Sequence, residues 1–192
     1  MERIVIGPGG TFPTLADALA QGLLEGTEVA FAAGQHPVGW LEIRGLRLVA
    51  QTAGSAELVG DLRALGAVSF SGLHLTGKVK VEGKVSFDHC KLDRDGEGPT
   101  LAVAGEAAAK LTACEVLATG PQFAVAALVA DQGKMEAGDT TFAHAAGLAL
   151  QVQDSASVSL TGCRVEGGGE DGISLWASDE AKVGLKGGRV LS

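Results

Sequence analysis

A spacing of apolar residues recurs seven times along this chain of 192 residues. In residues 157–165, SVSLTGCRV, apolar or small side chains stand at Val158 and then two, five and seven positions later, with polar residues between them. The seven starting positions are Leu41, Val68, Val85, Ala109, Met135, Val158 and Val183. The step from Leu41 to Val68 is the longest and the step from Val68 to Val85 the shortest. This self-similarity predicts a solenoid.

Each repeat is typical of two short strands joined by a two-residue corner, because the apolar positions alternate with polar ones on both sides of the corner. The second corner residues are Gly45, Gly72, His89, Ala113, Asp139, Gly162 and Gly187. Most of these residue types tolerate a positive φ, which predicts a left-handed kink at this place. Ala113 is the exception to the pattern.

A third strand precedes the two others in the longer repeats. It is expected near Leu101, Val125, Leu148 and Ile173. Three strands per turn, stacked on the next turn at about 4.8 Å, form a parallel coil around one column of apolar side chains. The predicted fold class is therefore an all-β parallel β-helix of about seven coils.

The N-terminal segment differs from the repeats. Residues 3–6 indicate a strand, and a helix is expected near residues 14–24, with Thr14 and Asp17 forming a capping box and Gly26 at its end. We expect this helix to cover the apolar end of the coil. The chain is predicted to be a single domain, residues 1–192, with residues 1–40 as the N-terminal cap and residues 41–192 as coils.

A resemblance to a known family follows from these elements. The segment TFPTLADALAQGLLEGTEVAFAAGQHPVGWLEIRGLRLVA resembles the N-terminal part of right-handed parallel β-helix proteins of the pectin lyase-like superfamily, in which a helix, a glycine before a strand, a turn and a first coil follow in this order. His36 stands where that superfamily usually has Tyr. The resemblance implies a right-handed coil but no single activity, because the superfamily includes lyases, esterases, hydrolases, tailspikes and non-catalytic interaction domains.

One interval leaves other architectures open. The short step from Val68 to Val85 also fits a left-handed β-helix or a bactofilin-like filament. The longer later steps and the glycine corners favour the right-handed coil.

The composition argues against some classes of binding partner. The formal charge of −8 argues against a nucleic-acid or anionic-membrane surface, and no apolar run is long enough to span a bilayer. The first residues lack the pattern of a secretion signal, so a cytoplasmic location is expected. Cys90, Cys114 and Cys163 share one repeat position, which predicts an inward row of reduced thiols with no disulfide or metal site.

The resemblance also implies where chemistry would lie, since carbohydrate-active β-helix enzymes keep their catalytic groups on the outward positions of the third strand. Those positions are Thr100, Ala102, Ala124, Ala126, Leu128, Ala149, Gln151, Ser174 and Trp176. None is an acid, a base or a histidine, so the paired carboxylates of pectin methylesterases and the calcium ligands of pectate lyases are missing. We therefore predict no catalytic residue, no cofactor and no metal ion.

The other titratable residues are expected to lie on an ordinary solvent-exposed surface and not in a catalytic site. Asp88 and His89 are expected to form a solvated corner, and His74 and Lys91 to lie on a mixed-charge sheet. Two acidic turns resemble loose calcium loops without the spacing of a known site. Their acidic residues are Asp93, Asp95 and Glu97 in the first turn and Glu166, Glu170 and Asp171 in the second.

The uncharged third-strand face suggests an interface. If its side chains point outward they form an apolar stripe, which soluble monomers seldom expose, with Trp176 and Leu128 as anchors. The proposed interface residues are Trp176, Leu128, Ala126, Ala102, Ala149, Gln151 and Ser174. The competing interpretation is that long turns cover this stripe. A second expected contact is the last coil, where no amphipathic element follows Val190.

Two functions from different classes follow. The first is a non-catalytic scaffold or protein-interaction module that binds a protein partner or a second copy of itself through the uncharged face or the last coil. The alternative is a carbohydrate-binding or carbohydrate-active protein, in which Trp176 and Trp40 stack on a sugar ring. A polysaccharide therefore remains a candidate partner.

Overall fold

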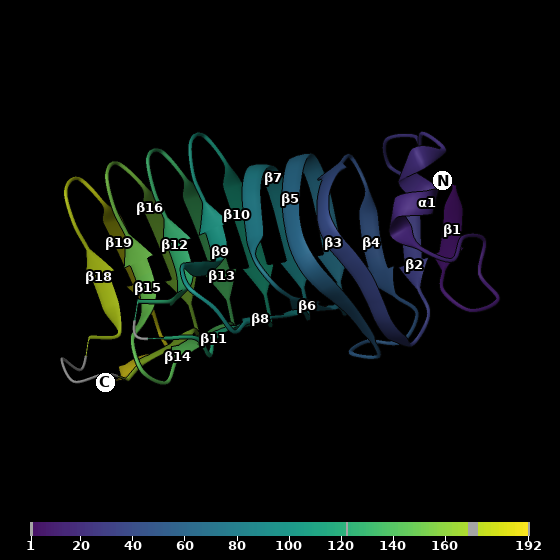
Figure 1. The fold of residues 1–192 in the computed structure, drawn as a ribbon. Coiled ribbons are helices and arrows are strands. Elements are labelled where there is room, and N and C mark those ends of the chain that lie inside the picture. The colour runs from purple at the N-terminus through teal and green to yellow at the C-terminus, as the bar shows by residue number, and fades with distance from the viewer. Residues whose placement is uncertain (1, 122, 169–172, 192) are drawn as a thin grey trace.

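The structure is a computed structural model that describes residues 2–121, 123–168 and 173–191. Within these residues the chain winds into a right-handed parallel β-helix of twenty strands, with one short helix near its N-terminus (Figure 1). The strand pairs of this part of the chain are parallel and join each strand to its counterpart one turn further along. The predicted fold class is confirmed.

The strands stack in three columns, which we call sheets 1, 2 and 3 in the order in which a coil passes through them. Sheet 1 contains β9 (Pro99–Val103), β12 (Val125–Val129), β15 (Leu148–Val152) and β18 (Leu175–Ala177). Sheet 2 contains β1 (Arg3–Ile6), β2 (Glu28–Phe31), β4 (Arg47–Ala50), β10 (Ala108–Thr112), β13 (Lys134–Gly138), β16 (Ser157–Thr161) and β19 (Lys182–Lys186). Sheet 3 contains β6 (His74–Thr76), β8 (Lys91–Arg94), β11 (Glu115–Ala118), β14 (Thr141–His144), β17 (Arg164–Gly167) and β20 (Arg189–Leu191).

Three longer strands pass through corners without interruption and contribute to more than one sheet. They are β3 (Gly34–Arg44, sheets 3 and 1), β5 (Ala56–Ser71, sheets 3, 1 and 2) and β7 (Val79–Asp88, sheets 1 and 2). With β5 and β7 included, sheet 2 has nine rungs, from β1 to β19. Nine stacked rungs correspond to about eight turns, one more than the seven coils predicted.

The first predicted repeat was wrong in its register. Leu41 pairs with Leu62, which pairs with Val79, so Leu41 belongs to sheet 1 and not to the column of Val68 and Val85 in sheet 2. The sheet 2 rung of this coil is β4, which pairs with the end of β5. The misassignment explains why the first step was the longest. β1 and β2, inside the predicted cap of residues 1–40, already stack as rungs of sheet 2.

The predicted kinks are confirmed. All seven second corner residues have a positive φ, including Ala113 with φ 50°. An alanine in this conformation costs roughly 1–2 kcal/mol, which the surrounding strand pairing must offset. Six of these residues lie at the corner from sheet 2 to sheet 3, so the coils from β5 onward turn there at the same place, whereas Gly45 lies between β3 in sheet 1 and β4 in sheet 2.

The shortest coils depend on glycine at a second kind of corner. A Cβ atom on Gly83 would lie 2.3 Å from both the nitrogen and the oxygen of Gly66, the equivalent residue one turn before. A Cβ atom on Gly77 would lie 2.4 Å from the oxygen of Gly60. These close backbone approaches let β5 and β7 turn without a loop, which makes the short coil between Val68 and Val85 possible.

The interior is one column of buried apolar side chains. Phe70 stacks on Phe87 with ring centroids 5.0 Å apart and planes 4° apart. Phenylalanines are the largest fully buried residues, so this tube holds more aromatic volume than its low aromatic content suggested. The three cysteines are buried and unpaired in one inward row, as predicted. A hydrogen bond to Cys114, together with burial, raises the pKa of Cys90.

The helix, α1 (Leu15–Ala20), begins as predicted. The Thr14 hydroxyl accepts a hydrogen bond from the amide of Asp17 and donates one to its carboxylate. The helix ends earlier than residue 24, because Gly22 adopts φ 72° directly after the C-cap. Its six residues lie at the N-terminal end of the coil and bury Leu15 and Ala18 there (Figure 1). In the described part of the chain, no helix is long and apolar enough to cross a membrane.

Substituting Gly83 with alanine tests the stacked glycine corner. We expect Gly83→Ala to lower the free energy of unfolding by roughly 2–3 kcal/mol, because the new methyl group meets the backbone of the neighbouring turn. Gly138→Ala is the matched control, since a Cβ atom there meets nothing within 4 Å. Urea unfolding of both variants checks this, and equal midpoints would contradict the close approach.

The burial of the cysteine row predicts that its three thiols react slowly with external reagents. In the folded protein we expect Cys90, Cys114 and Cys163 to react with a thiol reagent only at the rate of unfolding, because all three are buried. In denaturant all three should react at once. Absorbance with an aromatic disulfide reagent measures both rates, and rapid labelling of the native protein would show that the row is open to solvent.

Candidate ligand groove

The predicted interface face on sheet 1 divides into two rows. Thr100, Ala126, Ala149 and Ser174 form a row next to sheet 3 and are buried, with Ala126 fully inaccessible to solvent. The Thr100 hydroxyl donates a hydrogen bond to the carbonyl of Leu117, at 2.8 Å. Neighbouring segments of the chain therefore cover this row, as the competing interpretation expected, and Ala124 is buried with it.

The other row of sheet 1 is partly exposed. Its residues in consecutive rungs are Glu42, Arg63, Lys80, Ala102, Leu128, Gln151 and Trp176. Ala102 is buried, Leu128 and Gln151 are half-buried, and Trp176 is 51% exposed. The apolar stripe is therefore shorter than predicted. Trp40 lies six rungs from Trp176, about 29 Å at strand spacing, so the two rings cannot stack on one sugar.

Sequence reasoning missed the charged half of this row, because the sheet 1 strands of the first coils run inside β3, β5 and β7. Arg63 donates hydrogen bonds from Nη1 to Glu42 at 2.5 Å and from Nε to Glu82 at 2.7 Å, and its Nη2 also binds Glu82. Lys80 pairs with Glu82 at 2.5 Å. The prediction that this face has no acid or base is therefore wrong for its first coils.

These ion pairs indicate that the cluster formed by Glu42, Arg63, Lys80 and Glu82 has a structural role. The hydrogen bonds from Arg63 lower the pKa of Glu82, and those from Lys80 add to this effect. A general acid in glycoside or ester chemistry needs a carboxyl group that holds its proton near neutral pH. Glu82 is held ionised and bound to two cations, so the arrangement joins adjacent rungs and supplies no proton.

Sheet 3 has a second polar cluster, around His74. Its Nε2 lies 2.8 Å from Asp93, which also pairs with Lys91 at 3.2 Å. The Thr76 hydroxyl donates to Glu57 at 2.7 Å, and this hydrogen bond lowers the pKa of Glu57. The mixed-charge surface predicted for His74 and Lys91 is confirmed, since His74 lies between Glu57 and Asp93 of the rungs on either side, and Asp93 pairs with Lys91 within β8.

The remaining sequence candidates lie at corners and turns. His89 lies 3.0 Å from Asp88 at an exposed corner, and Glu166 pairs with Arg164 at 2.5 Å. Glu170 and Asp171 fall outside the described residues. Where the structure describes the chain, no group of three His, Cys, Asp or Glu side chains is placed to hold a metal ion.

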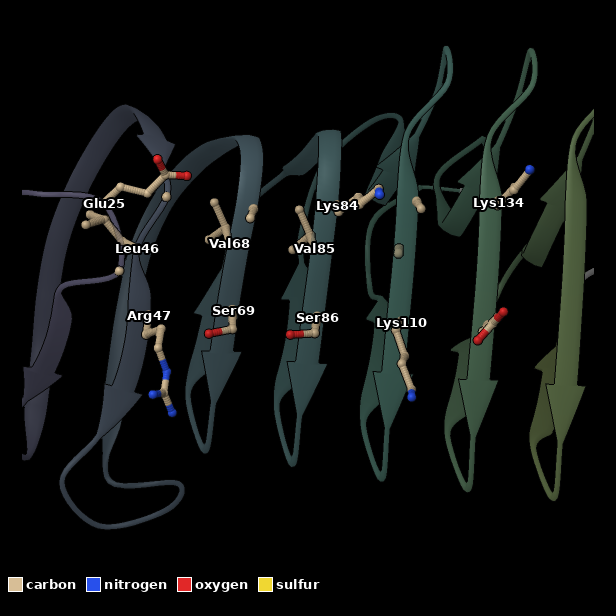
Figure 2. A pocket seen from close by; sticks show the side chains of 16 residues that line it. Glu25, Leu46, Arg47, Val68, Ser69, Lys84, Val85, Ser86, Lys110 and Lys134 are labelled. Atoms are coloured by element: carbon tan, nitrogen blue, oxygen red, sulfur yellow. The ribbon is translucent and has the colours of Figure 1, made fainter. Parts of the chain in front are cut away.

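A large concave surface lies on sheet 2, where no site was predicted. A groove of about 580 Å³ crosses the rungs from β4 to β13, and a hollow of about 210 Å³ continues it over β16. Figure 2 shows Ser69, Ser86 and Lys110 at one level on successive strands, with Glu25 at one end of the groove and Lys134 toward the other. Four rung spacings give this groove a length of about 19 Å.

The outward residues of sheet 2 explain the hollow. Ala67, Ser69, Ser86 and Ala108 line its floor with small side chains, and the surface it presents is mostly apolar. The longer side chains of Lys84, Lys110 and Lys134 stand among them. Small residues on consecutive rungs align because the strands pair in register, so the hollow runs along the axis of the coil.

The groove has the opposite charge to the whole protein. The chain has 15 basic and 23 acidic residues. Strand residues that face outward on sheet 2 include seven of the basic ones and only three of the acidic ones. The basic residues are Arg3, Arg47, Lys84, Lys110, Lys134, Lys182 and Lys186, and the acidic ones are Glu28, Asp88 and Glu136. The second sheet is thus a basic face on an acidic protein.

The groove lysines also differ from the other charged clusters in having no internal partner. Among residues 2–121, 123–168 and 173–191, no carboxylate lies within ion-pair distance of the ammonium groups of Lys84, Lys110 and Lys134. The charges on sheets 1 and 3 are mostly neutralised by their neighbours, whereas these three remain available to an external anion.

The comparisons with known proteins concern the fold. No protein-family model matches the sequence, and a search of curated proteins finds no match. Among solved structures, a pectin methylesterase from Aspergillus niger superimposes with a TM-score of 0.71 at 11% identity, over 96% of this chain and 85% of that one. The pectin methylesterase PemA from Erwinia chrysanthemi gives 0.60 at 12% identity, over 91% and 69%. The chain therefore has the pectin lyase-like right-handed parallel β-helix fold that these two enzymes share.

Proposed function

We propose that this protein is a carbohydrate-binding β-helix that holds an elongated acidic glycan along the groove of sheet 2. The observation that carries the proposal is the groove itself, in which three lysines that pair with no carboxylate in the described part of the chain stand over a floor of small side chains. Cations above an apolar floor suit a ligand that combines carboxylates with the apolar faces of sugar rings.

The dimensions of the groove support a polymer and not a small molecule. It follows the axis of the coil over five rungs, and a pyranose unit in an extended chain advances by about the length of one rung. Ser69 and Ser86 supply hydroxyl groups at the same level as the Lys110 side chain (Figure 2). A linear glycan of about four units would contact each of these groups.

The fold is consistent with such a ligand. The two similar solved structures are named as pectin methylesterases, and pectin is a polysaccharide. Their identity to this chain is too low to transfer an activity, and the groove lies on a different sheet from the face expected to hold catalytic groups in this superfamily. Our proposal is for binding, because the polar lining side chains are mainly lysines and serines, with two exposed carboxylates, Glu25 and Glu136, at opposite ends.

Removing the three groove lysines tests the proposal. We expect the triple variant Lys84→Ala, Lys110→Ala, Lys134→Ala to bind acidic oligosaccharides roughly tenfold more weakly, with a smaller dependence on salt, because three charge pairs are lost. Titration calorimetry against a panel of acidic and neutral oligosaccharides measures the affinity.

The control is a second triple variant with the same change in charge, Lys78→Ala, Lys91→Ala, Arg189→Ala, whose residues lie outside the groove. Circular dichroism confirms that both variants fold. Equal losses in both variants would show a general charge effect, and a wild-type protein that binds no glycan in the panel would refute the proposed function.

A second candidate, self-association, has its own observation. Near the last described rungs, large apolar side chains are exposed, namely Ile173, Trp176, Leu185, Val190 and Leu191. The strand edges of β18, β19 and β20 have a pairing partner on one side only among the described strands. Such a surface favours pairing with a second copy, as sequence analysis expected for the last coil and for Trp176.

Light scattering at increasing protein concentration tests this candidate. We expect a dimer in the wild-type protein and a monomer in the double variant Trp176→Glu, Val190→Glu, because two charges would be buried at the contact. Trp40→Glu, which exchanges a similarly exposed tryptophan at the other end, should leave the dimer intact. A wild-type monomer at all concentrations would eliminate self-association.

A further inference from the structure

A second cavity lies at the N-terminal end of the coil, apart from the groove of sheet 2. It has a volume of about 310 Å³ and lies between the turn that follows β1 and the start of β3. We call it the N-terminal pocket. It shares no lining residue with the groove. Its volume is at the lower end of the range of ligand pockets, which suits a small ring compound and not a polymer.

Apolar groups, many of them rigid, form a large part of the walls of the N-terminal pocket. Pro8, Pro13 and Pro37 line it, together with Leu15 and Ala33. A proline ring has little conformational freedom, so the three rings form a wall whose shape exists before a ligand arrives. Their C–H groups can pack against the negative face of an aromatic ring. The pocket is therefore suited to a planar aromatic ligand.

The imidazole of His36 supplies an unused hydrogen-bond acceptor in this pocket. His36 is only 6% exposed, and its Nε2 donates a hydrogen bond to the carbonyl oxygen of Ala32, at 2.8 Å. Because a carbonyl oxygen can only accept, Nε2 carries the proton, and Nδ1 of the neutral ring is an acceptor. Among the described residues, no donor pairs with Nδ1. A ligand in the pocket can therefore donate a hydrogen bond to it.

Gly7 leaves this edge of the His36 ring uncovered. A Cβ atom on Gly7 would lie 3.1 Å from Cε1 and 3.9 Å from Nδ1 of His36. Gly7 also adopts φ 120°, a conformation that disfavours any residue with a side chain. Both residues line the pocket. A hydrogen bond to an acceptor that is shielded in this way contributes more to affinity than one made in open water.

The other polar groups of the pocket also favour an uncharged hydrogen-bond donor. The Thr14 hydroxyl already donates to the carboxylate of Asp17, and the Gln35 amide donates to Glu57, which leaves the Gln35 side-chain oxygen as a further acceptor. Among the described residues that line the pocket, none is Asp, Glu, Lys or Arg. An anion would find no cation there to offset its loss of hydration. The pocket therefore differs in its ligand chemistry from the basic groove.

We infer that the N-terminal pocket binds a small, uncharged aromatic compound with a phenolic hydroxyl group. The ring packs against the prolines, and the hydroxyl group donates a hydrogen bond to Nδ1 of His36. His36 is the residue that determines specificity for a donor. The inference is independent of the proposed glycan binding, because the pocket and the groove have no residue in common.

Titration of the full chain with phenol, anisole and benzoate, followed by NMR of the backbone amides, tests the inference. Anisole has the ring without the donor, and benzoate has the ring with a negative charge. We expect phenol to bind roughly tenfold more tightly than anisole, because anisole cannot donate to Nδ1, and benzoate to bind more weakly than phenol. The amide signals that move should belong to residues 7–15 and 33–37.

Two variants separate the acceptor from the cavity. His36→Phe keeps an aromatic ring but removes Nδ1, so we expect it to bind phenol and anisole equally. Ala33→Leu, at an exposed position in the wall, fills part of the cavity and should weaken the binding of both compounds. The triple lysine variant of the groove is the control and should bind phenol as the wild-type protein does. Circular dichroism confirms that the variants fold.

Three outcomes would overturn the inference. The first is equal affinity of the wild-type protein for phenol and anisole, which would show that Nδ1 of His36 accepts no hydrogen bond from the ligand. The second is a set of moving amide signals that lies outside the pocket, or the failure of phenol to bind. The third is unchanged phenol binding in Ala33→Leu, which tests the cavity even if His36→Phe does not fold.

Discussion

In-register stacking of each coil on the one before it is the constraint on which the whole structure depends. A strand in a parallel β-helix can pair only if its inward side chains lie over inward side chains of the same strand in the next turn. Phe70 over Phe87 and the cysteine row are direct results of this rule. Outward side chains obey the same register, so each surface property of the protein is organised in rows parallel to the axis.

The corners decide which of these rows reach solvent. Between sheets 3 and 1 the later coils have connecting segments, and the row of Ala126 and Ala149 beside them is buried. From β5 onward the corner between sheets 2 and 3 has two residues and a left-handed kink, and the groove is lined mainly by residues of sheet 2 itself. A groove forms on the sheet whose own side chains are small and whose adjoining corner is short.

The charged side chains on the three sheets are arranged in two ways. On sheets 1 and 3, Arg63 and His74 each lie between carboxylates of neighbouring rungs, and these pairs connect one turn to the next. On sheet 2, Lys84, Lys110 and Lys134 line the groove from successive rungs, and no carboxylate of the described residues lies within ion-pair distance of them. The first arrangement satisfies charge within the protein, whereas the second leaves it for a ligand.

The sequence by itself determined the class of fold, the parallel strands, the positive φ at six of the seven kinks and the inward cysteine row, because these follow from a local alternation of apolar residues and from residue types at fixed offsets. It assigned Leu41 to the wrong sheet, since β3, β5 and β7 turn at stacked glycines without a polar interruption. Only the tertiary structure decided which outward residues are covered and which rows align. The partners of Arg63, the burial of Ala126 and the groove of sheet 2 all depend on contacts between successive turns, whose residues lie too far apart in the sequence for a local pattern to contain them.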